Sequence, residues 1–348
     1  MKRLTLLALL VLIPMMIFAQ SVTEQTSNAS ETRIYTDSLG RNVEIPVTVT
    51  KVAPSGNVAQ LAIYAVAPEK MVGWSSRLSD TAMATFLPEV AELPVFGAFY
   101  GKKANLNKEA LIVANPEIVI DVGEIKGSKE EMAKQLDELS ANIGIPIVFV
   151  EGYLENADEM FLMLGDILNK DDQAKALAKF SRDALDMGIE KRDGINTTVY
   201  YSSAPDGLQA VETGSFHGEV IEYIGARNIV PESFTKSNGS TSLEQIYLWD
   251  PDVIILSSKD AYATATTDKA WAELRAVQNG NVIMMPIVPY PFLDTPPATN
   301  RIIGIYWLGN KLNPEMYDLD INQKVKEFYS LFYHKELTDA ELESILNP

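Results

Sequence analysis

The chain has 348 residues, with 29 Lys and Arg against 47 Asp and Glu, and a formal net charge of −18 at pH 7. A surface this acidic repels nucleic acid and anionic lipid, so neither is expected as a partner. The absence of cysteine excludes disulfides, thiolate metal sites and cysteine nucleophiles. The length exceeds what one hydrophobic core comfortably serves, which predicts more than one domain.

The N-terminus has the pattern of a secretory signal peptide. Lys2 and Arg3 form a basic segment, residues 4–18 are almost wholly apolar, and Ala19 is a small residue suited to a cleavage site. The apolar run is short for a membrane span. We therefore expect a periplasmic protein, cleaved near Ala19 and not inserted in the membrane afterwards; an uncleaved N-terminal anchor is the alternative. Residues 20–30 are rich in Ser, Thr, Glu and Asn, which predicts a disordered leader.

Residues 31–168 predict a first α/β lobe. Two short alternating runs at 33–36 and 43–46 flank a glycine-containing turn, which favours a hairpin. The apolar, β-branched run at 117–122 is typical of a strand buried on both faces of a parallel sheet. Further strands are predicted at 51–53, 71–74 and 147–150, and helices at 57–65, 108–114, 129–142 and 157–168.

Residues 171–192 predict one long helix. The stretch has acids at its start, Lys and Arg at its end and no proline, and its apolar positions recur at three- and four-residue steps. The predicted buried face comprises Ala174, Leu177, Ala178, Ser181, Leu185 and Ile189. We interpret residues 169–193 as a rigid connection between two lobes, with Gly188 as its one weak point, so that only modest lobe closure is expected. The alternative is a surface helix of one large domain.

Residues 194–348 predict a second lobe with closing helices. Strands are predicted at 197–201, 253–256 and 281–285, and helices at 218–224, 242–248, 269–274, 300–312 and 323–332. Alternation of strands and helices on both sides of the long helix predicts two doubly wound, Rossmann-like α/β lobes. The ligand cleft is expected between them.

Two segments of the chain repeat one pattern. Asn107 stands two residues before Glu109, and a proline seven positions after that glutamate opens an apolar strand; Ser242, Glu244 and a second proline repeat the spacing. Asn and Ser are good N-caps, which puts both glutamates at the second helical position, and Ser242 with Gln245 fits a capping box. A carboxylate there stabilises a helix by about 0.3–1 kcal/mol on its own account. As a matched pair, the glutamates also suit basic residues of a two-fold symmetric partner.

On these features the sequence resembles the ABC-importer substrate-binding proteins whose lobes are joined by one long helix. This class III group serves iron–siderophores, cobalamin, haem and oxyanions such as molybdate. The resemblance rests on residues 37–45, on Glu109 and Glu244 with the strands that follow them, on residues 271–282 and on the helix at 301–312. It implies a monomeric receptor for an ABC permease dimer with its ATPase subunits, onto which Glu109 and Glu244 dock.

Loops at the carboxyl ends of the predicted strands hold the candidate ligand contacts, because open α/β sheets bind ligands there. Aromatic side chains can stack on a flat chelate or macrocycle, and cations can pair with carboxylate, catecholate or oxyanion oxygens. The candidates are Trp74, Tyr100, Lys102, Lys103, His217, Tyr290, Phe292 and Arg301. An iron–siderophore is the first expectation, followed by a corrinoid or haem; molybdate or tungstate is the rival that the cationic candidates would suit.

Other functional classes fit less well. The chain has two histidines, so a three-histidine site for a free metal ion cannot form, and we expect no direct metal ligands and no resident cofactor. The Ser215 loop resembles a hydrolase elbow, but Thr213 occupies the position where a G-x-S-x-G motif requires glycine. We therefore predict no enzymatic activity. A hydrolase or a sensory module on the same fold remains the remote alternative.

Overall fold

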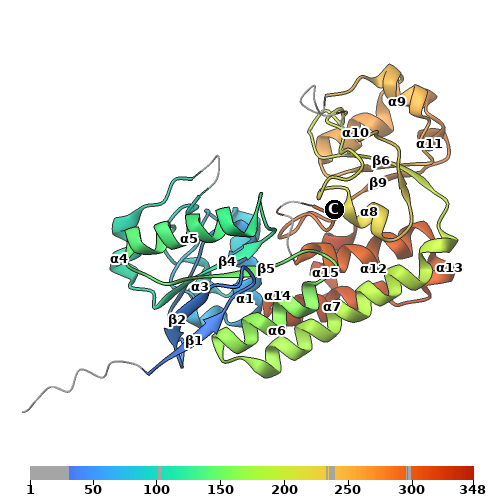
Figure 1. Cartoon of the computed structure of the whole chain (residues 1–348). Coiled ribbons are helices and arrows are strands. Elements are labelled where there is room, and N and C mark those ends of the chain that lie inside the picture. The colour runs from blue at the N-terminus through green and yellow to red at the C-terminus, as the bar shows by residue number, and fades with distance from the viewer. Residues whose placement is uncertain (1–30, 101–103, 233, 235–239, 295, 297–298) are drawn as a thin grey trace, which may run out of the picture. The chain divides into compact units, whose positions relative to one another are not determined.

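A computed structural model describes residues 31–348 except 101–103, 233, 235–239, 295 and 297–298 (Figure 1). Residues 31–348 form one compact unit. The predicted signal peptide at 1–19 and the predicted leader at 20–30 lie outside the described residues. None of the helices in the described part is both long and apolar enough to cross a membrane.

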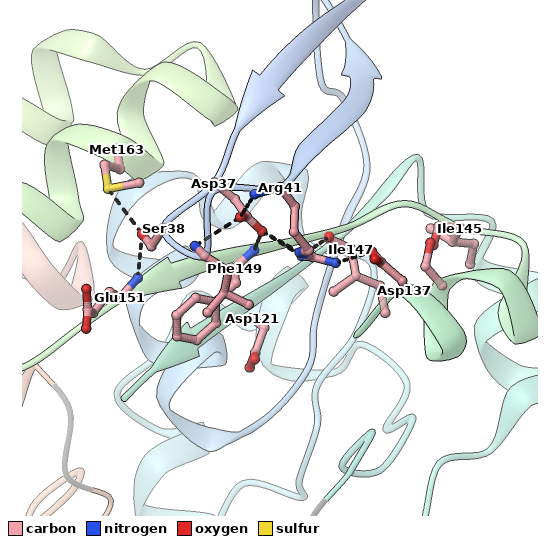
Figure 2. A network of polar contacts seen from close by, with 12 residues as sticks. Asp37, Ser38, Arg41, Asp121, Asp137, Ile145, Ile147, Phe149, Glu151 and Met163 are labelled. Atoms are coloured by element: carbon pink, nitrogen blue, oxygen red, sulfur yellow. Dashed lines mark hydrogen bonds and ion pairs between the residues drawn. The ribbon is translucent and has the colours of Figure 1, made fainter. Parts of the chain in front are cut away.

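The predicted hairpin is confirmed as the antiparallel pair β1 (Thr32–Thr36) and β2 (Asn42–Pro46). Its turn is fixed by Asp37, whose carboxylate accepts hydrogen bonds from the backbone of Arg41 and from the Arg41 guanidinium, at 2.6 Å from Nη2 (Figure 2). The same guanidinium donates to Asp137 and to the carbonyl of Ile147, both at 2.8 Å. Since Asp37 also accepts from the backbone N–H of Phe149, this network ties the hairpin to the neighbouring sheet.

The first lobe is built on a parallel sheet in the order β3-β4-β5. Its strands are β3 (Val52–Pro54), β4 (Ile118–Gly123) and β5 (Ile147–Glu151). Its helices are α1 (Asn57–Val66), η1 (Pro68–Lys70), α2 (Asp80–Met83), α3 (Pro88–Ala91), α4 (Lys108–Ala114), α5 (Lys129–Ile143) and α6 (Ala157–Leu168). The strand predicted at 71–74 is wrong: Met71 and Trp74 form only isolated bridges, because each pairs with a different segment.

The second lobe is built on a parallel sheet in the order β7-β6-β8-β9. Its strands are β6 (Thr198–Ser202), β7 (Arg227–Asn228), β8 (Val253–Leu256) and β9 (Val282–Met284). Its helices are α8 (Glu219–Tyr223), α9 (Leu243–Trp249), α10 (Lys259–Thr267), η4 (Trp271–Glu273) and α11 (Arg275–Gln278). The helix predicted at 269–274 is reduced to a 3₁₀ turn, because the backbone of Leu274 is extended. The sequence analysis missed α10, whose threonines are poor helix formers.

The long connecting helix is α7 (Asp171–Lys191), followed by η2 (Arg192–Gly194). It packs beside α6 (Figure 1) and is pinned to it by an ion pair between Arg182 and Asp158 at 2.6 Å. Ile189, predicted on the buried face, is 49% exposed, whereas Phe180 is buried there instead. Gly188 is a packing position: a Cβ at this residue would lie 2.9 Å from the Tyr223 ring of α8.

The chain closes with α12 (Asn300–Leu312), α13 (Pro314–Tyr317), α14 (Ile321–Tyr333) and α15 (Asp339–Leu346). These helices do not pack on the second lobe alone. The Tyr64 hydroxyl of α1 donates to the carbonyl of Tyr333 at 3.1 Å, and Gln173 of α7 donates to the carbonyls of Ala65 and Leu331. One hydrophobic core accordingly runs through α1, α6, α7, α12 and α14. The domain limits of 31–168, 169–193 and 194–348 stay a prediction.

The internal repeat extends into strand register. Val119 of β4 pairs with Ile147 of β5, and Ile254 of β8 pairs with Val282 of β9, with the same spacing in sequence. The residue after the proline of each repeat makes the same kind of hydrogen bond. Glu117 accepts from the backbone N–H of Lys51 at 3.1 Å, and Asp252 accepts from that of Thr198 at 2.9 Å, each at the start of the neighbouring strand. The two sheets are therefore built on one plan.

Candidate functional site

At the carboxyl edge of the first sheet lies a buried carboxylate. Asp121 is the fourth residue of β4 (Figure 2), and its two oxygens accept hydrogen bonds from the hydroxyls of Ser55 and Tyr100. Burial raises the pKa of Asp121, although both hydrogen bonds oppose that shift. Tyr100, which stands in a predicted ligand-binding loop, is thus held by an acid that the sequence analysis did not select.

At the carboxyl edge of the second sheet lies a polar cluster made of Tyr201, His217, Glu219, Asp294 and Arg301. The Tyr201 hydroxyl, from β6, donates to Asp294 Oδ2 at 2.5 Å, and His217 Nδ1 lies 3.8 Å from the same oxygen. Arg301 forms an ion pair with Glu219. Two predicted ligand contacts, His217 and Arg301, thus each lie beside an acid, and the two pairs are connected in sequence because His217 and Glu219 are two residues apart.

Three buried polar atoms of this polar cluster have no hydrogen-bond partner among the described residues: His217 Nδ1, Asp294 Oδ1 and Arg301 Nε. Buried polar groups in folded proteins are almost always paired, because an unpaired one costs about 1–3 kcal/mol. Three such atoms in one cluster mark a place where a bound molecule or water completes the hydrogen bonding. A ligand with both donor and acceptor groups would suit it.

Arg301 is the buried cation of the polar cluster. Its side chain is 5% exposed, and burial lowers its pKa to about 10. It is the second residue of α12, so a buried cation stands at a helix N-terminus, where the helix dipole disfavours positive charge. Glu124, from the loop after β4, faces Arg301 from the first lobe, and burial raises the pKa of Glu124. A buried cation of the second lobe therefore lies close to acids of both lobes, Glu124 and Glu219.

A small cavity of about 20 Å³ adjoins Arg301, enough for one water molecule. Both lobes line it. Its walls are Val58, Ala62, Gly152, Tyr153, Leu154, Ala157 and Met160 on one side, and Thr299, Arg301 and Ile302 on the other. A cavity lined by residues of both lobes thus adjoins a buried cation.

The remaining predicted contacts divide into three groups. Trp74 and Phe292 are 1% exposed, and the Trp74 indole N–H donates to the carbonyl of Val90, so both pack in the core and their role as ligand contacts stays a prediction. Tyr290 is half-buried with its ring against Phe86. The predicted contacts at positions 102 and 103, both lysines, lie outside the described residues.

The sequence analysis missed the acids of this region. Asp121 follows three apolar residues within a strand, and a charged residue at that position was the available signal. Asp294 stands in the proline-rich loop that was singled out for Tyr290. Glu124 and Glu219 carried no signal in the sequence alone. No group of acids and histidines in the described part of the chain is arranged to hold a metal ion.

The helices that lead into β4 and β8 carry the matched glutamates near their N-termini. Asn107 caps α4 by accepting from the N–H of Ala110, and Ser242 caps α9 by accepting from that of Gln245. Glu109 and Glu244 both follow at the second helical position and both are exposed. Hydrogen bonds from its own backbone N–H and from Ser242 lower the pKa of Glu244, which keeps that carboxylate ionised.

Comparisons with known proteins agree with this geometry. A family described as periplasmic binding protein matches residues 81–288. An ABC transporter solute binding protein from Sulfurospirillum deleyianum is 30% identical, with a TM-score of 0.80 over 91% of this chain and 99% of that chain. A periplasmic solute binding protein from Veillonella parvula is 27% identical, with a TM-score of 0.74 over 91% and 97%.

A third solved structure, a molybdate periplasmic binding protein of a Haemophilus influenzae ABC transporter, is 21% identical, with a TM-score of 0.66 over 88% of this chain and 99% of that chain. At this identity the likeness supports the fold alone. No curated protein sequence matches the chain.

Proposed function

The chain belongs to the periplasmic binding protein family of ABC transporters, and we propose that it captures a metal chelate of the iron–siderophore type and delivers it to an ABC permease. Members of this family bind solutes for transport and are not enzymes. The chelate, the contact residues and the docking residues are parts of the proposal.

The observation that carries the proposal is the polar cluster with its three unpartnered atoms beside the cavity. Arg301 supplies a desolvated cation for anionic oxygens of the ligand, and charge-assisted hydrogen bonds of this kind are about twice as strong as neutral ones. His217 and Asp294 add groups that can accept or donate. The half-buried Tyr153, which lines the cavity, and Tyr290, in the loop before α12, offer aromatic surface for a flat ligand.

A chelate suits this region better than a small free oxyanion. Glu219 pairs with Arg301 and Glu124 acts on it from the first lobe, so a tetrahedral anion bound there would face two carboxylates. A chelate presents anionic oxygens to the arginine while its metal and polar edges lie against the acids. Because the cavity holds only about one water, we expect its two walls to separate when a chelate binds.

Glu109 and Glu244 are proposed to dock onto basic residues of the permease dimer. One exposed carboxylate from each half of the repeat matches a partner with two equivalent subunits. The polypeptide is proposed to act as a monomer in this complex, with the ATPase subunits on the far side of the permease.

A thermal-shift screen tests the ligand assignment. The probes are a ferric catecholate, a ferric hydroxamate, cyanocobalamin, haemin and sodium molybdate. A ligand at 100 times its dissociation constant stabilises the protein by about 2.7 kcal/mol, so the matching chelate is expected to raise the melting temperature by several degrees. A shift with molybdate alone would replace the chelate by an oxyanion, and a shift with cyanocobalamin or haemin alone would replace it by a macrocycle.

A further inference from the structure

Two aliphatic side chains on the repeated segments are almost fully exposed. Val113 on α4 is 85% exposed and Leu248 on α9 is 79% exposed, the two highest values among the exposed large hydrophobic residues of the described chain. They occupy equivalent positions, since each lies four residues after its glutamate, Glu109 or Glu244. Single exposed hydrophobic residues scattered over a surface need no explanation. Here the two most exposed ones coincide with the internal repeat.

Folding does not require either side chain. Each helix buries its inner face through a different residue of the repeat, Leu111 in α4 and Ile246 in α9, both 0% exposed. A methyl-bearing side chain left in water gains nothing for the fold, whereas its burial against a partner contributes about 1.5–3 kcal/mol. The conformation that presents these side chains is also repeated, because both helices end on a left-handed residue, at φ 50° in one and 46° in the other.

Each exposed aliphatic side chain stands next to a carboxylate. Residues four apart on a helix lie on one face, with Cβ atoms about 5–6 Å apart. Glu109 with Val113, and Glu244 with Leu248, therefore form two matched charged-and-apolar pairs, one from each lobe. Ile112, which is 63% exposed, enlarges the apolar part on α4.

We propose that Val113 and Leu248 are the apolar contacts of the permease-docking surface, beside the charged contacts of Glu109 and Glu244. This inference rests on the proposed function and refines it. The partner is a permease dimer that presents, once in each subunit, a basic side chain about one helical turn from an apolar patch. In such interfaces a desolvated apolar contact holds the complex, while the charges guide the encounter and fix its register.

The test measures the affinity of the mature protein for the permease–ATPase complex of the same organism in lipid nanodiscs. Val113→Ser and Leu248→Ser are each expected to weaken binding about 10-fold, and the double variant about 100-fold. Ile34→Ser is the matched control, because Ile34 is 63% exposed on β1, outside the repeat. The melting temperature of all variants is expected to stay unchanged, since these side chains are exposed in the folded state.

A Glu109→Gln/Glu244→Gln double variant distinguishes the two levels of the proposal. If the glutamine substitutions weaken binding and the serine substitutions do not, the apolar contacts are overturned while permease docking stands. If only one of the two serine variants has an effect, the matched two-fold surface is overturned. If neither the glutamine nor the serine substitutions change the affinity, docking through α4 and α9 is itself wrong.

Discussion

At the amino ends of their strands the two sheets carry corresponding groups in corresponding places, and at the carboxyl ends they do not. The acid at 117, before β4, makes the same kind of hydrogen bond as the acid at 252, before β8, and the helix before each acid carries a matched glutamate, Glu109 or Glu244. At the carboxyl end, Asp121 of β4 stands where β8 has Leu256. The second lobe instead obtains its buried carboxylate, Asp294, from a loop.

This difference follows from what each group of residues is proposed to meet. A dimeric permease offers the same surface twice, so the helices proposed to face it can stay alike. A small ligand has no such symmetry, and the polar groups of the two lobes differ: Tyr100 and Asp121 in one, His217, Asp294 and Arg301 in the other. The repeat is expected to be most exact where the proposed partner is symmetric.

Loss of the cation at the carboxyl edge is the largest effect expected. Arg301→Ala removes the buried partner of anionic ligand groups and leaves Glu219 unpaired, so chelate affinity should fall roughly 30- to 1,000-fold. Isothermal titration with the chelate identified in the screen measures it. Arg33→Ala is the control, because Arg33 pairs with Asp166 on the surface, far from the site in sequence. Equal affinities for wild type and Arg301→Ala would remove Arg301 from the site.

Substitution of Trp74 tests whether this residue packs in the core or contacts the ligand. Its ring stacks near Tyr64 and Phe86 in the core, so Trp74→Ala should lower the free energy of unfolding by about 3–5 kcal/mol. Chemical denaturation measures this loss, and ligand affinity measured well below the melting temperature should be unchanged. A stable variant with weakened ligand binding would return Trp74 to the ligand site.

The matched strand-start acids should respond alike to substitution. Glu117→Gln and Asp252→Asn each replace a charged acceptor of backbone N–H groups, and each is expected to cost about 1 kcal/mol of stability. Unequal costs, with only one variant destabilised, would show that the shared hydrogen-bonding pattern does not reflect shared energetics.

Asp252 also predicts a dependence on pH. Hydrogen bonds from the Thr198 backbone and side chain, and the nearby Arg275, lower its pKa from 3.8 to about 2. A carboxylate whose pKa is lower in the folded state contributes stability above its unfolded pKa and loses it as the pH falls through the folded one. The difference in stability between wild type and Asp252→Asn should therefore shrink between about pH 4 and pH 2. A constant difference over that range would contradict the assignment.

The fold was largely predictable because its elements are local patterns. Helices α4, α6 and α12 have the predicted limits, because apolar periodicity marks their extent and, in α4, the Asn107 cap marks the start. Helices α4 and α9, and the strands β4 and β8 that follow them, were recognised because both segments have the same spacing from glutamate to proline. The secondary-structure prediction failed where pairing with distant segments decides the local structure, as at Met71 and Trp74, whose bridges join them to such segments.

The candidate site was less predictable because it is assembled across the chain. Arg301 and His217 were predicted from their loop positions and chemistry. The acids that interact with them, Glu219 and Glu124 with Arg301 and Asp294 with His217, are brought close only by the fold. The sequence alone also cannot distinguish whether an aromatic residue near a strand end lies in the cleft or in the core. The structure resolves Trp74 and Phe292 into the core.

The most direct test of the account is the permease affinity of the Glu109→Gln/Glu244→Gln double variant, measured in nanodiscs beside Glu130→Gln. Glu130 is also the second residue of its helix, α5, and is exposed, so the control reproduces the local change outside the repeat. The account predicts at least a 10-fold loss of permease affinity for the double variant, with the ligand-induced melting shift unchanged and the control equal to wild type. Undiminished permease affinity in the double variant would contradict the docking of Glu109 and Glu244 onto the permease.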